Sequence, residues 1–199
     1  MSGAFPISTA KFESLGIKSI QNTIISKSVS GKKLARQIDG QRWGFTARII
    51  TAKRSDVYGQ LMAFIIKQRS GKENFTIVPP EVEDARGTAS GTPTGTASAG
   101  DTSITLGGTG TGTLKAGDFI KFANHSKVYM VVADQSDIST GTLTIEPPLT
   151  TAVSSSDIQY DDVPFTVYLT NDIQEFGVVG AGQDGTLLYQ FEFDVEEAL

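Results

Sequence analysis

The chain of 199 residues carries 22 acidic and 17 basic side chains, for a formal net charge of −5, and 39% of its residues are hydrophobic. That length and apolar content suffice for one large domain or two small ones with a buried core. The absence of cysteine and the presence of one histidine exclude disulfides, thiolate metal sites and sites built from several histidines. No apolar run approaches the roughly 18 residues that cross a bilayer, and we expect no signal peptide, because the first residues lack its pattern.

The charges are divided unevenly along the chain. Residues 1–86 hold 14 basic and 7 acidic residues, whereas residues 87–199 hold 3 basic and 15 acidic residues. One interpretation is that the basic first part and the acidic last part pair inside one sheet. The other is a head-to-tail oligomer, in which the basic face of one subunit meets the acidic face of the next. Nucleic-acid binding is disfavoured, because the basic residues are scattered and the total charge is negative.

The first fifty residues predict a hairpin and then a strand. Residues 18–29 form a long, polar stretch of strand character, the turn signal Ser30-Gly31 follows, and residues 32–38 continue the strand pattern. This is the pattern of a long β-hairpin with a basic tip. Too little of it is apolar for stability alone, so we expect it to lean on another surface. Residues 43–50 then alternate apolar and polar side chains, as a half-buried strand does.

Residues 55–69 form the one convincing helix of the sequence. Val57, Leu61 and Ile65 recur at helical spacing and make an apolar stripe for burial against a sheet. We expect the pair Ser55-Asp56 to cap its amino end and a Ser-Gly pair to end it. A short strand follows, and two consecutive prolines stop it.

The composition changes at residue 88, where Gly, Thr and Ser replace bulky side chains. Short strand patterns follow at a spacing typical of a small all-β module. They cover residues 103–106, 118–122, 127–132 and 142–145. Double prolines flank the segment, and strand pattern resumes directly after it. We therefore expect residues 88–150 to be a module inserted in a larger, discontinuous domain made of residues 1–87 and 151–199, with few contacts across the boundary.

The clearest strand of the chain is the last one, residues 187–196. One of its faces is apolar and the other is largely acidic. Its natural partner is the strand at 43–50, whose outward face carries Arg48. Two further strands are predicted, at residues 163–169 and 173–179.

The sequence contains no recognisable catalytic or metal-binding constellation. His125 falls in a predicted turn, where we expect it to be exposed, and no glycine-rich run has the spacing of a phosphate-binding loop. No acidic cluster has the spacing of a calcium loop. We therefore predict that the protein is not an enzyme and uses no cofactor or metal. A cysteine-free, β-rich chain with a polar hairpin arm favours an assembly component instead.

Four segments carry a family resemblance. They are QRWGFTAR at residues 41–48, the helix at 57–69, ENFTIVPP at 73–80 and LKAGDFIKF at 114–122. Together they resemble tail proteins of long-tailed bacteriophages, most closely the distal tail protein at the junction of tail tube and baseplate. The resemblance implies a mainly β fold: a belt domain of β-sandwich or barrel type with one α-helix and a long β-hairpin arm, and an inserted small all-β module.

The resemblance also implies a function. The protein would be a structural virion protein that forms a ring, expected to be a hexamer, at the distal end of a phage tail. This ring would join the tail tube protein to baseplate hub or tail-fibre proteins around the channel through which the genome passes. The protein would be made in the host cytoplasm and reside in the virion, with no membrane partner, no specific nucleic acid and no catalytic residues.

Two alternatives stay open. The chain could be a major tail tube or tail terminator ring protein, which copy number would separate from a single distal ring. Residues 88–150 could instead be a carbohydrate-binding adhesin module for a host surface glycan. Such a module needs aromatic platforms, and the sequence favours core packing for its aromatic residues Phe119, Phe122 and Tyr129.

The hairpin is the predicted assembly element. We expect it to reach a neighbouring subunit and extend that subunit's sheet by edge pairing, with the acidic residues after position 151 as its electrostatic partners. The predicted subunit-interface residues are Ile25, Lys27, Lys32, Lys33, Arg36, Glu192, Asp194 and Glu196.

Overall fold

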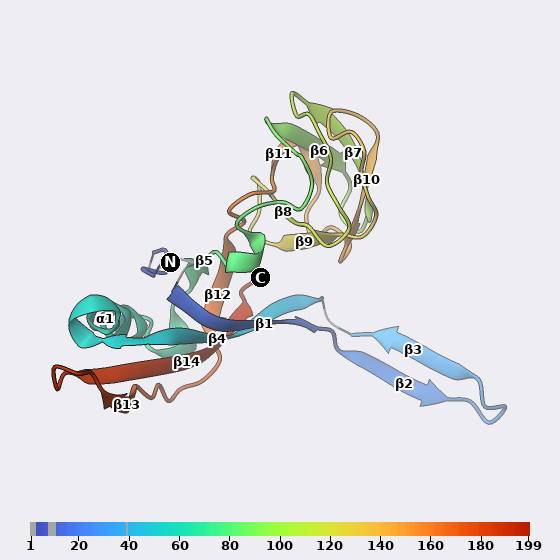
Figure 1. Cartoon of the computed structure of the whole chain (residues 1–199). Coiled ribbons are helices and arrows are strands. Elements are labelled where there is room, and N and C mark those ends of the chain that lie inside the picture. The colour runs from blue at the N-terminus through green and yellow to red at the C-terminus, as the bar shows by residue number, and fades with distance from the viewer. Residues whose placement is uncertain (1–2, 8–10, 39) are drawn as a thin grey trace.

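The structure is a computed structural model that describes residues 3–7, 11–38 and 40–199. Within these residues the chain forms a six-stranded sheet with one α-helix beside it, a closed six-stranded barrel and a separate two-stranded hairpin (Figure 1). The predicted fold class, mainly β with one α-helix, is confirmed. None of the helices in the described part of the chain has the length and apolarity of a membrane span.

The sheet is built around its two longest strands, β4 (Arg42–Lys53) and β14 (Leu187–Glu197), which pair antiparallel. The remaining strands are β1 (Phe12–Ile20), β12 (Phe165–Leu169), β5 (Phe75–Ile77) and β13 (Gly177–Ala181). The order is β1-β4-β14-β12-β5, with β13 pairing β14 beside this path. The predicted pairing of the last strand with the strand at 43–50 is confirmed, and Glu192 lies opposite Arg48.

The helix lies against this sheet through its predicted apolar stripe. It starts as a π-helical turn, η2 (Arg54–Tyr58), continues as α1 (Gly59–Lys67), and buries Leu61 and Ile65 completely. The predicted cap at Ser55-Asp56 is wrong: helical backbone begins one residue earlier, so both residues lie inside the first turn and no side chain caps it. Arg69 and Ser70 have left-handed backbone (φ 54° and 58°), which ends the helix where predicted. Two 3₁₀ turns follow the helix and β5, η3 (Ser70–Lys72) and η4 (Pro80–Val82).

The barrel closes in the order β10-β7-β6-β11-β8-β9. Its strands are β6 (Pro93–Ala97), β7 (Ser103–Gly108), β8 (Phe119–Phe122), β9 (Val128–Val131), β10 (Thr142–Glu146) and β11 (Val153–Gln159). The four strands predicted between residues 103 and 145 are all present. Two strands were not predicted: β6 lies in the Gly/Thr-rich stretch, and β11 follows residue 150, so the barrel extends beyond the expected module.

A glycine explains why β6 can be a barrel strand without bulky side chains. A Cβ atom on Gly95 would lie 2.7 Å from the ring of Phe122 and 2.9 Å from a methyl group of Ile104. The small residue therefore leaves room for Phe122, which is fully buried in the barrel. In β11 the pattern is weak because only its ends, Val153 and Ile158, are buried, whereas the residues between them are polar.

The barrel is attached to the sheet in two ways. The chain enters and leaves it side by side, since the Asp162 amide donates to the Glu83 carbonyl at 2.9 Å. The second attachment is a buried joint, which we define as Trp43, Lys127, Val128 and Glu197. The Glu197 carboxylate, on a residue 1% exposed, accepts hydrogen bonds from the Lys127 ammonium (2.5 Å), the Val128 amide (2.9 Å) and the Trp43 amide (3.1 Å).

The joint also has an apolar side. The Trp43 indole donates to the Val128 carbonyl at 2.9 Å, and its ring packs edge-on against Phe119, with centroids 5.1 Å apart. Phe119 and Val128 belong to the same buried cluster as the core of the sheet. The contacts that the structure shows between barrel and sheet are concentrated in this joint, and the expectation of few contacts across the boundary stays a prediction. That the two parts fold independently of each other stays a prediction.

The predicted hairpin is present as an arm, made of β2 (Thr23–Lys27) and β3 (Lys33–Gln37). It projects away from both the sheet and the barrel (Figure 1). It is shorter than the sequence pattern suggested, because residues up to Ile20 belong to β1 and pair with β4. A turn closes it, with the Ser28 amide donating to the Lys32 carbonyl at 2.9 Å.

Candidate subunit interface

The arm exposes apolar side chains on both of its faces. Every residue of β2 and β3 is exposed, including Ile25 at 57% and Leu34 at 51%. Val29 in the turn and Ile38 at the base are exposed as well. A two-stranded hairpin is at best marginally stable in water, and uncovered apolar side chains on it suit a protein partner.

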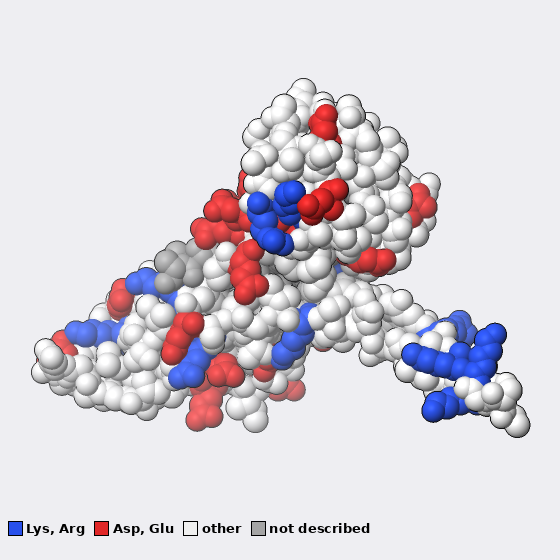
Figure 2. All heavy atoms as spheres, turned by 45° about the vertical axis from the view of Figure 1, so that its right-hand side comes forward, with Lys and Arg blue, Asp and Glu red and all other residues white. Residues whose placement is uncertain are grey.

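The arm is also strongly basic, as Figure 2 shows. Its charged side chains are Lys27, Lys32, Lys33 and Arg36, and none of them forms an ion pair with a residue that the structure describes. Lys27 stands directly opposite Lys33 in the hairpin register. Like charges in opposed positions destabilise a strand pair, so an acidic partner would stabilise this one.

The acidic residues predicted on β14 fall into two groups. Glu196 accepts a hydrogen bond from the Arg42 guanidinium at 3.0 Å, and Asp194 pairs with Lys18 at 3.5 Å. Both carboxylates are therefore already engaged within their own chain. Glu192 differs, because it is exposed and has no ion pair among the described residues.

These contacts bear on the uneven charge of the sequence. Pairs between the basic first part and the acidic last part include Lys18–Asp194, Arg42–Glu196 and Lys53–Asp184. The Lys53 ammonium and the Thr186 amide lower the pKa of Asp184 to about 2. Pairing inside one sheet therefore accounts for part of the uneven charge. The basic arm accounts for most of the net positive charge that remains in the first part of the chain.

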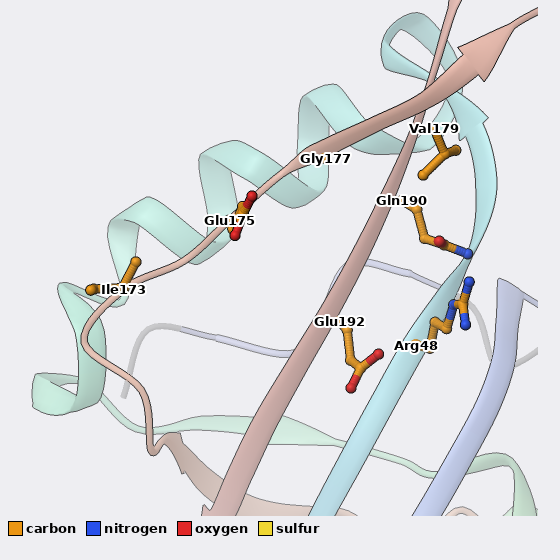
Figure 3. A pocket seen from close by; sticks show the side chains of 7 residues that line it. All are labelled: Arg48, Ile173, Glu175, Gly177, Val179, Gln190 and Glu192. Carbon is orange, nitrogen blue, oxygen red and sulfur yellow. The ribbon is translucent and has the colours of Figure 1, made fainter.

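A groove opens beside β13, where the segment before that strand crosses β14 (Figure 3). Its volume is about 440 Å³. The lining side chains come from β4, β13, β14 and the segment before β13, and are Arg48, Ile173, Glu175, Gly177, Val179, Gln190 and Glu192.

The groove combines uncovered carboxylates with uncovered apolar side chains. Ile173 is 85% exposed and Val179 is 53% exposed. Glu175 and Glu192 have no ion pair within the described part of the chain, whereas Arg48 forms an ion pair with Glu13 at 3.2 Å. The groove therefore offers apolar surface with a net negative charge.

Sequence reasoning missed this groove because it assigned residues 173–179 to a strand. Strand structure begins at Gly177 instead. The Phe176 ring stacks on Phe191, with centroids 4.5 Å apart, and this contact holds the preceding segment over β14 before pairing begins. The one aromatic residue of this segment, Phe176, was the available signal, but its partner Phe191 lies on another strand.

The predicted exposure of His125 is wrong. Its ring is half-buried and lies between the side-chain oxygen Oδ1 of Asn124 (2.7 Å from Nδ1) and the Tyr129 hydroxyl (2.8 Å from Nε2). Burial lowers the pKa of His125, and the positive charges of Lys121 and Lys127 lower it further. The described residues contain no group of His, Cys, Asp and Glu side chains that could hold a metal ion. We interpret the cluster of Asn124, His125 and Tyr129 as a set of hydrogen bonds that stabilises the barrel.

Comparison with known families gives a match over the barrel. Residues 82–161 match the family of the B domain of distal tail protein pb9, a range that contains every strand of the barrel. No curated protein matches the chain. The resemblance to distal tail proteins of long-tailed bacteriophages is therefore confirmed: the chain is a structural protein of a phage tail, and its barrel is similar to the B domain of the distal tail protein pb9.

Proposed function

We propose that this protein forms a ring at the distal end of the phage tail and joins the tail tube to the baseplate around a central channel. The observation that carries the proposal is the family match of the barrel, which is set into the larger β-sheet unit. The expected ring is a hexamer. Its neighbours are the tail tube protein on one side and hub or tail-fibre proteins on the other.

The exposed surfaces favour different roles for the sheet unit and for the barrel. The sheet unit, with its helix and arm, forms the belt of the ring, because the arm carries the uncovered apolar and basic side chains. The barrel is the outward module. Its candidate aromatic platform is buried, since Phe119 is 9% exposed and Phe122 and Tyr129 are fully covered. This burial favours a contact between proteins over a glycan site on the barrel.

The test has two parts. Native mass spectrometry of the purified full chain should give a closed oligomer of six copies, and a monomer at every concentration would contradict the ring. Labelling of intact virions should then place one ring at the tail tip. Many copies along the tail would instead identify the tail tube protein.

A further inference from the structure

We propose that the groove beside β13 receives the arm of a second copy of this chain. In this contact the arm face that carries Ile25, Lys27 and Lys33 lies against Glu175 and Glu192. The inference rests on the proposed ring and names the surface that each subunit offers to the next.

The register of the hairpin defines that face of the arm. Ile25 lies opposite Ala35, and Lys27 lies opposite Lys33. Since directly opposed residues of an antiparallel pair share a face, these four side chains project on the same side. The face thus has an apolar half next to two adjacent cations, neither of which has an anion among the described residues.

The groove presents the complementary pattern. Glu175 and Glu192 line it without ion pairs in the described part of the chain, and Ile173 and Val179 supply exposed apolar surface. A volume of about 440 Å³ accommodates several side chains. Cations would meet carboxylates and apolar side chains would meet apolar side chains, the combination that fixes the register of a protein contact.

The arm and strand β13, beside which the groove opens, lie on opposite sides of the sheet unit (Figure 1). The arm continues from the Ile20 and Arg42 ends of β1 and β4, whereas β13 pairs with the part of β14 that faces the Lys53 end of β4. The nearest groove residue on β4, Arg48, lies six residues beyond Arg42, which is about 20 Å along the strand. Because the arm projects away from the sheet, it points away from the groove of its own chain (Figure 1). Two different surfaces on opposite sides make a head-to-tail contact, the kind that closes into a ring when the rotation between neighbours divides a full turn.

The outer edge of β1 is the competing acceptor for strand pairing. Its charged side chains, Glu13 and Lys18, are both engaged, with Arg48 and Asp194 respectively. That edge offers no uncommitted carboxylate for the cations of the arm. Charge complementarity therefore favours the groove.

Cross-linking tests the contact directly, because the natural chain contains no cysteine. The double variant Ile25→Cys with Val179→Cys should give, after mild oxidation, a ladder of covalent oligomers on a non-reducing denaturing gel. The matched control is Leu34→Cys with Val179→Cys, which moves the first cysteine to the other face of the arm and should give no ladder. A ladder from the control alone would overturn the assigned face.

Charge reversal gives an independent measurement. Lys27→Glu with Lys33→Glu should weaken assembly by about 2- to 30-fold, and adding Glu175→Lys with Glu192→Lys should restore it. Rings that form normally in the wild type, with neither a ladder nor this rescue, would overturn the groove as acceptor while leaving the proposed ring intact. A wild-type chain that never oligomerises would overturn the ring and this contact together.

Discussion

The carboxylate of Glu197 does more to position the barrel than any other group in the joint. It accepts three hydrogen bonds, from two backbone amides and from Lys127, and it comes from the last residues of β14. Burial lowers the pKa of Lys127, and the neighbouring carboxylate opposes that shift. Lys127 therefore depends on Glu197 to remain charged out of water.

Substitution of Lys127 should reveal this dependence. Lys127→Met leaves Glu197 buried without its cation, so we expect a loss of about 3–5 kcal/mol in the free energy of unfolding. The matched control is Lys115→Met, which breaks the exposed pair with Asp134 and should leave the free energy of unfolding almost unchanged. Urea denaturation of both variants measures the difference. Equal losses would show that the joint contributes no more than a surface pair.

His125 should make the barrel sensitive to acid. Because its pKa is lowered in the folded state, the unfolded chain binds a proton more readily just below the ordinary value of 6.5. The stability from neutral His125 is complete above about pH 6.5 and is lost as the pH falls toward its folded pKa.

The variant His125→Gln isolates this contribution. It should be less stable than the wild type at pH 7.5, and the gap should narrow at pH 5.5, where the wild type has lost part of its advantage. Thermal denaturation at the two pH values measures the gap. A gap that stays constant would count against titration of this ring.

Regular patterns made the longest elements predictable. Strand β14 and helix α1 have strong periodicity along the sequence, and both were found where expected. Strands β6 and β11 were not found, because the signal for β6 is the absence of a side chain at Gly95 and most of β11 is polar. The candidate site was predictable in its arm, whose residues are adjacent in sequence. The groove was not, because it depends on Phe176 meeting Phe191.

The helix offers a direct check on its predicted stripe. Leu61→Ala should cost about 2–5 kcal/mol in the free energy of unfolding, because Leu61 is completely buried against the sheet. Ile66→Ala, on the exposed face of the same helix, should change it by less than about 0.5 kcal/mol. Chemical denaturation of the two variants compares the faces. A negligible effect at Leu61 would mean that the stripe faces something other than this core.

In the whole molecule the barrel is attached to the sheet unit by a compact buried joint and by two chain crossings. The barrel meets the sheet unit through the buried joint, yet the chain passes between them at neighbouring points, Glu83 and Asp162. A variant that removes the barrel therefore has to remove all of its strands, from β6 to β11. A linker in place of residues 88–150 would remove β6 and β8 and so leave β11 without its two partner strands.

Replacement of residues 86–160 by a short Gly/Ser linker should leave a folded sheet unit. We expect a loss of about 2–3 kcal/mol, because Trp43 would be uncovered. Circular dichroism should retain its β signal, and the replacement of 88–150 should be the less soluble of the two. An unfolded 86–160 variant would show that the sheet unit cannot fold without its barrel.

The joint also determines how mechanical force travels through the subunit. A pull on the barrel reaches the sheet at Trp43 on β4 and at Glu197 on β14, the two longest strands. These strands are hydrogen-bonded to each other along most of their length, from Leu188 to Glu196. Because Glu196 lies opposite Gly44, both attachment points are at the same end of the paired strands, so a pull on the barrel draws the two strands together instead of peeling one from the other. A tail subunit built in this way can bear a load at its barrel without first losing a strand.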